Sequence, residues 1–372
     1  MIHGPSATST RRVRAGLAAL WMVCLGWAGV RVAQAEPYLA VATGNPCVAC
    51  HVNPTGGGMR NAFGDAYAQT ALPASGLPAG SPIWTGQLLQ NILRVGADLR
   101  AAWSQTTTPH APTERGFQLE QMRLYADFSV IPGRLGLYVD ETVAPAVQNM
   151  EAYLRYGDPT RWYLKAGQFY LPFGWRLQDN SALVRQASGI SMLTPDQGIE
   201  LGFERVRWNG QLDFTNGAGN AGVGSGYQLL ARLVRVQGWW RIGASAASTQ
   251  SHAGNRRMGA VFAGLRTGPI AWLGEGDLIR QQGFADGAHT LLAGLIEADW
   301  LLRRGQNLKL TYEYYDPARR VSNDAQTRWS AVYEFTPMPF LQLRAGVRRS
   351  AGIPQNDLQN RTLAFLELHG YL

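Results

Sequence analysis

From about residue 86 onward, apolar and polar side chains alternate along segments of roughly ten residues, and turns separate the segments. In the first segment one face would hold Leu93, Val95, Ala97, Leu99 and Ala101. Comparable alternation recurs in 120–130, 149–156, 161–169, 239–247, 307–315, 327–336 and 340–349. A period of two residues is that of a strand, not of a helix. The pattern therefore predicts a mainly β chain.

The connections between these segments alternate between tight turns and long loops. The predicted tight turns begin at residues 131, 157, 208, 236, 267, 303 and 336. The predicted long loops lie near 104–118, 142–149, 170–198, 217–225, 248–257, 280–290, 316–327 and 350–361. Counting the segments between them gives about sixteen strands. An even number of antiparallel strands with short turns at one end is typical of an outer-membrane β-barrel, which we predict for residues 86–372.

The polar face of the strands is expected to line the lumen of this barrel, opposite the lipid-facing side chains. Its predicted charged members are Arg94, Asp98, Arg100, Arg123, Asp127, Glu151, Arg155, Lys165, Arg241, Glu297, Asp299, Glu313, Glu334, Arg344 and Arg348. The longest connection, 170–198, is expected to fold into the lumen and constrict it, because long loops in compact proteins tend to be functional. No stretch after the first 35 residues is apolar for long enough to form a membrane helix.

The first 35 residues have the pattern of a secretory signal. Three arginines precede an apolar run over 15–30, and Ala33-Gln34-Ala35 follows as a small-residue cleavage site. The alternative is a membrane-anchoring helix, for which the run is short. We expect residues 1–35 to be removed, Cys24 among them. The formal net charge of +8 then falls to about +4, because the signal holds four arginines and no acidic residue. That balance does not indicate a nucleic-acid partner.

A short segment, 36–72, precedes the barrel and is joined to it by a linker, 73–85, rich in proline and glycine. The segment contains CVACH at 47–51, and C-x-x-C-H is the attachment signature of a c-type haem. Cys47 and Cys50 would bond covalently to the porphyrin, and His51 would ligate the iron as the proximal ligand. A thioredoxin-like redox pair is the alternative, but no βαβ pattern surrounds the string.

The distal haem ligand is less clearly marked. Met59 follows the flexible glycines 56–58, and a His/Met pair would raise the reduction potential. An ordinary methionine in a turn is the alternative. Met59 is therefore a candidate distal ligand to the haem iron.

The whole arrangement resembles the fused monohaem cytochrome–porins of the outer membrane. The residues that carry the resemblance are CVACHVNP at 47–54 and RNAFGDAY at 60–67, which contains a similar Asn-x-Phe-Gly element. The stretch GQFYLPFGWR at 167–176 is similar to the phosphate-selective porin O and P family. The resemblance implies one covalent haem c, the outer membrane of a Gram-negative bacterium, and oxidation of extracellular Fe(II), as in the best known members.

Physical size gives a separate reason for joining the two parts. A segment of about 45 residues is near the size below which a domain needs a metal or other support to fold. A barrel of sixteen strands leaves a lumen that could hold such a segment. We therefore expect the cytochrome c-like segment to lie in or at the lumen.

Two classes of function follow. In the first, the protein is an electron conduit between an extracellular donor such as Fe(II) and a soluble periplasmic cytochrome, or the same conduit running outward to an extracellular acceptor. Outer-sphere transfer requires no acid–base or nucleophilic residue, so no catalytic residue is predicted and the sequence leaves open whether the protein is an Fe(II)-oxidising enzyme. In the second, the barrel is an anion diffusion channel with inward arginines as an electrostatic funnel, and the haem segment is an appendage.

Overall fold

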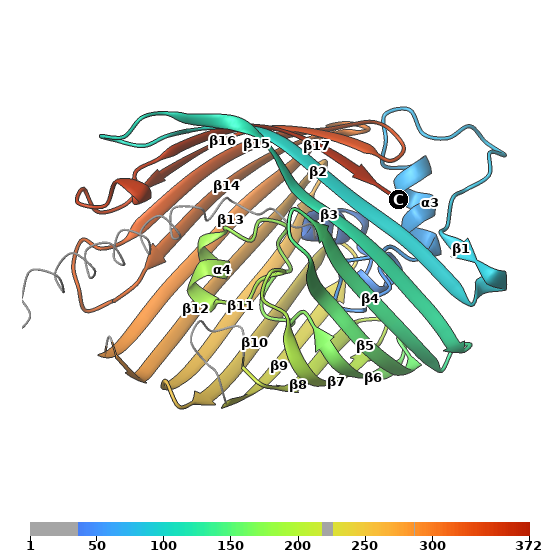
Figure 1. Ribbon diagram of the computed structural model, residues 1–372, viewed down its shortest axis with the longest axis horizontal. Helices are drawn as coiled ribbons and strands as arrows, with labels where there is room; N and C mark the ends of the chain where they lie inside the picture. Colours follow the sequence, from blue (N-terminus) through green and yellow to red (C-terminus); the bar gives the residue numbers. More distant parts are fainter. Residues whose placement is uncertain (1–35, 218–225, 286) are drawn as a thin grey trace, which may run out of the picture. The chain divides into compact units, whose positions relative to one another are not determined.

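The alternating segments form a closed barrel in the computed structural model, which describes residues 36–372 except 218–225 and 286. The predicted signal peptide 1–35, with Cys24, lies outside the described residues. Strands β2 to β17 each pair antiparallel with their sequence neighbours, and β17 pairs with β2. These sixteen strands close the barrel shown in Figure 1. The predicted mainly β fold and the barrel of sixteen strands are confirmed, whereas the haem-binding character of the N-terminal segment stays a prediction.

The bounds of the elements are as follows. The strands are β1 (Gln87–Leu88), β2 (Leu93–Thr107), β3 (Glu114–Ile131), β4 (Leu135–Ala144), β5 (Gln148–Asp158), β6 (Trp162–Phe169), β7 (Asp196–Glu204), β8 (Trp208–Thr215), β9 (Gly226–Gln237), β10 (Trp240–Ser251), β11 (Asn255–Thr267), β12 (Ile270–Phe284), β13 (Gly287–Arg303), β14 (Gln306–Asp316), β15 (Gln326–Met338), β16 (Leu341–Ala351) and β17 (Thr362–Tyr371). The helices are α2 (Pro37–Thr43), η1 (Cys47–Ala49), α3 (Ala62–Thr70), η2 (Leu89–Asn91), α4 (Leu183–Ser188) and η3 (Asp357–Gln359). Within the described part of the chain, every helix is too short or too polar to cross a bilayer.

The two faces of the strands separate as the sequence predicts. Along β9 the side chains alternate between exposed and buried from Tyr227 to Val236. Of the fifteen charged residues predicted to face inward, twelve are buried, and the other three, Arg94, Asp127 and Arg155, are half-buried. Apolar side chains of the predicted outer face, such as Leu99 and Leu124, are exposed. The lumen is therefore polar and charged, and the outer surface is apolar.

Several predicted connections are wrong in length or position. The predicted long loops 142–149 and 248–257 are only the three-residue connections 145–147 and 252–254. The predicted loop 280–290 is mostly strand, because β12 extends to Phe284 and β13 begins at Gly287. The loop predicted at 104–118 shrinks to 108–113. The ends of these strands carry polar residues on both faces. Their sequence therefore predicts a loop, although their backbone still pairs with the neighbouring strand.

Two tight turns are also displaced. Trp208 begins β8, and the turn before it is 205–207. Thr336 lies within β15, and the turn that follows is 339–340. The predicted turn residues 208–210 lie within β8, and 336–338 lie within β15, each next to the observed reversal.

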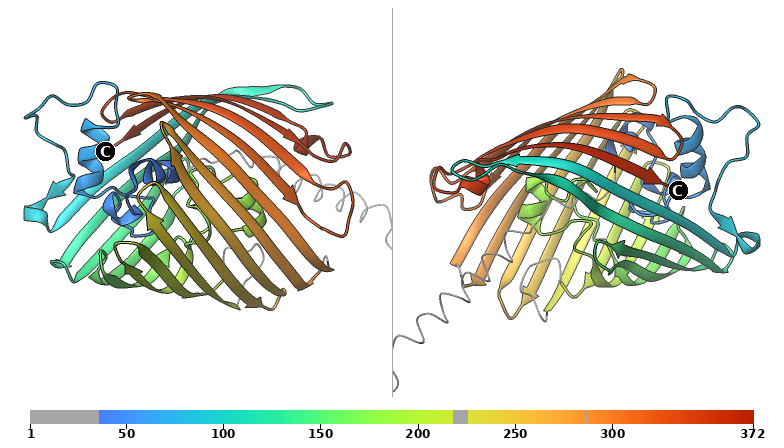
Figure 2. Two further views of the ribbon diagram at one scale, coloured as in Figure 1. Left: turned by 180° about the vertical axis from the view of Figure 1, so that it is seen from behind. Right: turned by 45° about the horizontal axis from the view of Figure 1, so that its top comes forward.

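Two segments enter the barrel, and the views in Figures 1 and 2 show α4 inside it and α3 at its mouth, beside the C-terminal end of the chain. The connection 170–195, which contains α4, folds inward as predicted; its Tyr170, Phe173 and Trp175 are buried. The N-terminal segment carries α2 and α3 and packs against the barrel wall, with Tyr38 and Val41 in the same apolar cluster as Phe262. The segment lies at the tight-turn end, where Arg304 of the β13–β14 turn donates to the Pro73 carbonyl at 2.8 Å.

Candidate functional site

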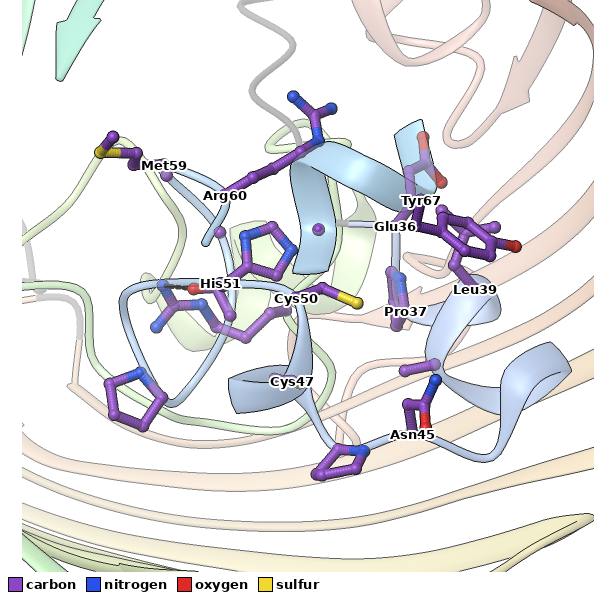
Figure 3. Close-up of a pocket in the computed structure, with 18 of the residues that line it drawn as sticks. Glu36, Pro37, Leu39, Asn45, Cys47, Cys50, His51, Met59, Arg60 and Tyr67 are labelled. Carbon is purple, nitrogen blue, oxygen red and sulfur yellow. Dashed lines mark hydrogen bonds between the residues drawn. The ribbon is translucent and has the colours of Figure 1, made fainter. Parts of the chain in front are cut away.

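The C-x-x-C-H string forms a single tight turn inside the barrel. The backbone N–H groups of Cys50 and His51 both donate to the carbonyl oxygen of Cys47, at 3.1 and 3.0 Å. This turn is the short helix η1 and brings the two thiols and the imidazole onto one stretch of backbone. Figure 3 shows Cys50 and His51 among the residues that line the adjoining cavity.

The Asn-x-Phe-Gly element fastens the next helix to this turn. The Asn61 side chain caps α3 by accepting from the N–H groups of Phe63 and Gly64, both at 3.0 Å. Its amide nitrogen also donates to the Val48 carbonyl at 2.9 Å. A side chain at Gly64 would place its Cβ 2.1 Å from the Cys50 carbonyl oxygen. The element therefore sets how closely α3 approaches the cysteine turn.

The glycines that follow allow the chain to fold back under the cysteine turn. Gly56, Gly57 and Gly58 all have positive φ, at +90°, +81° and +61°. A Cβ at Gly56 would lie 3.2 Å from the Cβ of Cys47, and one at Gly58 would lie 2.4 Å from the hydroxyl of Tyr138. Side chains here would be strained and would collide with both the turn and the barrel wall.

Barrel arginines hold this segment mainly through its backbone. Four of them donate to main-chain carbonyl oxygens at 2.8 to 3.0 Å. These contacts join Arg155 to Val52, Arg176 to Gly56, Arg241 to Asn45 and Arg266 to Ala42. The donors come from β5, from the 170–195 connection, from β10 and from β11. The segment is thus fixed from several sides of the barrel.

A smaller number of side chains of the segment are bound directly. Asn53, which is fully buried, donates to Glu151 at 2.7 Å and accepts from Lys165 at 3.3 Å. Asp65 of α3 forms an ion pair with Arg94 of β2 at 3.0 Å. Burial raises the pKa of Asp65 to about 6, although the charges of Arg60 and Arg94 oppose this rise.

A cavity lies beside the cysteine turn and contains about 1510 Å³ of space between protein atoms, including the part open to solvent. Cys47, Cys50 and His51 line it together with residues of α2, α3, β9 and β10. The three residues predicted to hold the haem therefore share one cavity.

The thiols and the imidazole are in forms that suit haem attachment. Cys47 and Cys50 are free and half-buried. Burial raises the pKa of the Cys50 thiol, and the neighbouring Cys47 adds to the rise. Burial also lowers the pKa of His51 to about 4, helped by the charges of Arg60 and Arg176. The ring is therefore neutral near pH 7.

The His51 Nδ1 atom is buried and has no hydrogen-bond partner among the described residues. A neutral imidazole with an unused nitrogen can ligate a metal ion. Two free thiols, this imidazole and the adjoining cavity fit a covalent haem, although haem itself stays a prediction.

Met59 is placed differently. Its side chain is 3% exposed and packs toward Gly96 of β2, where a Cβ on the glycine would lie 3.6 Å from the methionine Cγ. Its backbone N–H donates to the Tyr138 hydroxyl at 2.9 Å. Figure 3 shows its thioether directed away from the His51 ring. A role as distal ligand stays a prediction, and it requires the side chain to turn.

With this geometry in place, the chain can be compared with known proteins. No family model matches the chain, and no curated protein matches it in sequence. The fold is that of the outer-membrane porins. The anion-selective porin from Comamonas acidovorans superposes with a TM-score of 0.60 at 9% identity, over 75% of this chain and 99% of that chain.

Two further solved structures give the same result. The outer membrane channel DcaP of Acinetobacter baumannii superposes with a TM-score of 0.57 at 12% identity, over 75% of this chain and 97% of that one. OmpT of Vibrio cholerae gives 0.59 at 9% identity, over 77% and 99%. At such low identities the likeness establishes the fold alone.

Several residues at the site could not be identified from the sequence. Arg176 and Arg232 line the cavity but were not predicted to belong to a site, and Tyr138 anchors the segment. Strand alternation does place Arg232 on the inner face, next to Val234. What the sequence lacks is any signal of which inward residues meet the N-terminal segment, because contacts such as those of Arg176 with Thr55 and Gly56 join positions far apart in the chain.

Proposed function

We propose that the protein is an electron conduit of the outer membrane, in which a haem held by Cys47, Cys50 and His51 passes electrons across the barrel. The observation that carries the proposal is that the residues on either side of the C-x-x-C-H turn are hydrogen-bonded to the inner face of the barrel: Asn45 to β10, and Val52 and Asn53 to β5. A cytochrome segment that served only as a periplasmic appendage would not need these contacts. The porin fold supports location in the outer membrane.

Within this proposal, the chain's own residues bind and shield the cofactor. The two thiols would form the thioether links, and the neutral His51 ring would ligate the iron. The turn is half-buried inside the barrel, which limits its contact with water. A bound haem would supply a one-electron carrier whose potential the surrounding charges would tune. The Gly56–Gly58 turn and the 170–195 connection meet: Arg176 donates to the Gly56 carbonyl and to the Thr55 hydroxyl.

The partners remain part of the proposal. Fe(II) outside the cell is the proposed donor, and a soluble periplasmic cytochrome is the proposed acceptor. Each Fe(II) oxidised to Fe(III) would release one electron, which would reduce one acceptor haem. The same barrel run in the opposite direction would deliver electrons to an extracellular acceptor.

An anion channel is the second candidate. The anion-selective porin with the same fold and the arginines of the lumen favour it. The two segments inside the barrel weigh against free diffusion, because both the N-terminal segment and the 170–195 connection occupy the lumen and contact each other through Arg176.

The conduit can be tested in liposomes loaded with oxidised cytochrome c. Purified protein that retains a haem stain on a denaturing gel is inserted into the bilayer, and Fe(II) is added outside as a membrane-impermeant chelate. We expect the internal cytochrome to become reduced, and its absorption spectrum measures this reduction. His51→Ala should stop the reduction, because it removes the proposed iron ligand, whereas His110→Ala, in an exposed loop, should not.

The opposite result is equally clear. If the internal cytochrome stays oxidised while small anions cross the bilayer freely, the conduit proposal is wrong and the channel takes its place.

A further inference from the structure

Arginines dominate the charge of the cavity beside the cysteine turn. Five arginines and three carboxylates line it. The arginines are Arg60, Arg123, Arg176, Arg232 and Arg241, and the carboxylates are those of Glu36, Asp98 and Glu204. The excess of positive charge grows once the ion pairs are counted.

Three of these eight groups already have partners. Glu36 pairs with Lys309 at 2.7 Å, Asp98 pairs with Arg100 at 3.0 Å, and Arg123 lies 3.5 Å from Asp140. Four arginines and one carboxylate, Glu204, are left. A cavity built in this way is strongly anion-attracting.

Three of the four remaining arginines are deeply buried. Arg176, Arg232 and Arg241 are 7%, 8% and 5% exposed. Among the described residues, no carboxylate lies within 4.0 Å of their guanidinium nitrogens. Glu204 acts on Arg232 and Arg241 only from beyond this distance. A buried cation without a directly paired anion carries a desolvation cost that is only partly offset. An anionic ligand would remove this cost.

Their hydrogen bonds go to neutral groups and are incomplete. Arg176 donates to a hydroxyl and two carbonyls, Arg241 to two carbonyls, and Arg232 to the side-chain oxygens of Asn209 and Gln211. The Nε atoms of Arg176 and Arg232 are buried and have no partner in the described structure. Each is a donor that a ligand oxygen could satisfy.

The three arginines come from separate elements but converge on the cavity. Arg232 and Arg241 project inward from the neighbouring strands β9 and β10, where Arg232 lies opposite Ser245 and Arg241 opposite Val236. Arg176 reaches the cavity from the connection between β6 and β7. Since all three line the space that Cys47 and His51 also line, they face whatever is bound there.

We propose that Arg176, Arg232 and Arg241 form a carboxylate-binding site, and that its ligands are the two propionate groups of the haem. This inference rests on the proposed function, because it takes the haem to be attached at Cys47 and Cys50. Guanidinium groups bind carboxylates through charge-assisted hydrogen bonds. A free oxyanion such as phosphate has the same chemistry and is the alternative source of the ligand.

The first measurement is the midpoint potential of the haem in Arg176→Gln, Arg232→Gln and Arg241→Gln. We expect a lower potential in each, because a nearby positive charge favours the reduced iron and its loss leaves a propionate uncompensated. Replacement by lysine should restore much of the potential. The matched control is Arg256→Gln: Arg256 is also buried and donates to the Ala187 carbonyl, but it does not line the cavity.

The second measurement identifies the source of the anion. Inorganic phosphate is titrated into the haem-loaded protein and into Cys47→Ala/Cys50→Ala, and the melting temperature is followed. We expect phosphate to stabilise only the haem-free protein, and Arg232→Gln to weaken this binding by about tenfold, as loss of one charge-assisted hydrogen bond implies. Saturable phosphate binding to the haem-loaded protein would overturn the propionate assignment.

The two proposals fail in distinguishable ways. If haem is attached but no cavity variant changes its potential, the arginine site is wrong while the conduit stands. If the wild-type protein carries no haem, the proposed function fails, and the phosphate titration alone tests the arginine site. Phosphate binding that is weakened by Arg232→Gln but not by Arg256→Gln would then support an anion-binding site. The absence of phosphate binding would overturn the anion-binding site.

Discussion

Lys309 lies in the barrel wall among four carboxylates, and it links the N-terminal segment to the strands. Its Nζ is 2.7 Å from Glu36, and 3.8 to 3.9 Å from Glu297, Asp299 and Glu334. Burial raises the pKa of Glu36 to about 7, while the charge of Lys309 opposes that rise. One ammonium therefore stabilises several buried anions of both parts of the chain.

Lys309→Met should destabilise the protein by about 3–5 kcal/mol near pH 7, because it leaves buried carboxylates without their cation. The free energy of unfolding in urea measures this loss. The loss should shrink as the pH falls toward 5, since protonation removes the repulsion, and Lys309→Arg should keep most of the stability. An unchanged unfolding midpoint at pH 7 would contradict the role given to Lys309.

For single residues, the sequence predicts the chemical role of a local motif better than it predicts which distant residues contact that motif. The spacing of Cys47, Cys50 and His51 predicts a haem site because the pattern is local, and the structure places all three beside one cavity. Arg176 belongs to no such local pattern, although it lines the same cavity and donates to the Gly56 carbonyl. Its partner is fixed only when the barrel closes.

The connection 170–195 is the element that fills the loop side of the lumen. Arg328 and Arg348 hold its Asp179 at 2.9 and 3.0 Å, and Arg256 donates to the Ala187 carbonyl. These arginines belong to β11, β15 and β16, so the connection is bound to the far wall of the barrel.

Replacing 171–194 with a short glycine–serine link should raise the single-channel conductance severalfold in a planar bilayer. The barrel should still close, because β6 and β7 pair directly from Trp162↔Phe203 to Phe169↔Asp196. Shortening 352–361, which is mostly exposed or half-buried, is the matched control and should leave the conductance low. A conductance equal to that of the wild type would contradict a closing role for the inward connection.

The sequence predicts which segments form strands but not where each strand ends. The alternation with a period of two residues is visible within each strand, so it predicts the sixteen strands. The polar pair Gln250↔Asn255 is still paired strand although it reads as loop. Cross-strand pairing, which the sequence does not display, decides where such a strand ends.

For the whole molecule, the two ends of the barrel differ. The N-terminal segment lies at the end with tight turns, and the longer connections 317–325 and 352–361 lie at the other. If the haem segment faces the periplasm, the longer connections face outside the cell.

A thiol probe that does not cross membranes should therefore label Ser322→Cys on intact cells, and should leave Thr160→Cys unlabelled. Both positions are exposed, Ser322 in a long connection and Thr160 in the turn after β5. Permeabilising the outer membrane should make both react, which controls for exposure. Labelling of Thr160→Cys alone on intact cells would mean that the barrel is inverted.

The backbone contacts between the barrel arginines and the N-terminal segment bear on how freely the segment can evolve. A carbonyl oxygen is present whatever side chain a residue carries, so substitutions at Ala42, Asn45 or Val52 leave the acceptors of these hydrogen bonds in place. These contacts therefore depend on the backbone conformation of the segment and not on the identity of its side chains. Sequence drift should therefore be broad at such positions and narrow at Gly56, whose positive φ maintains that conformation.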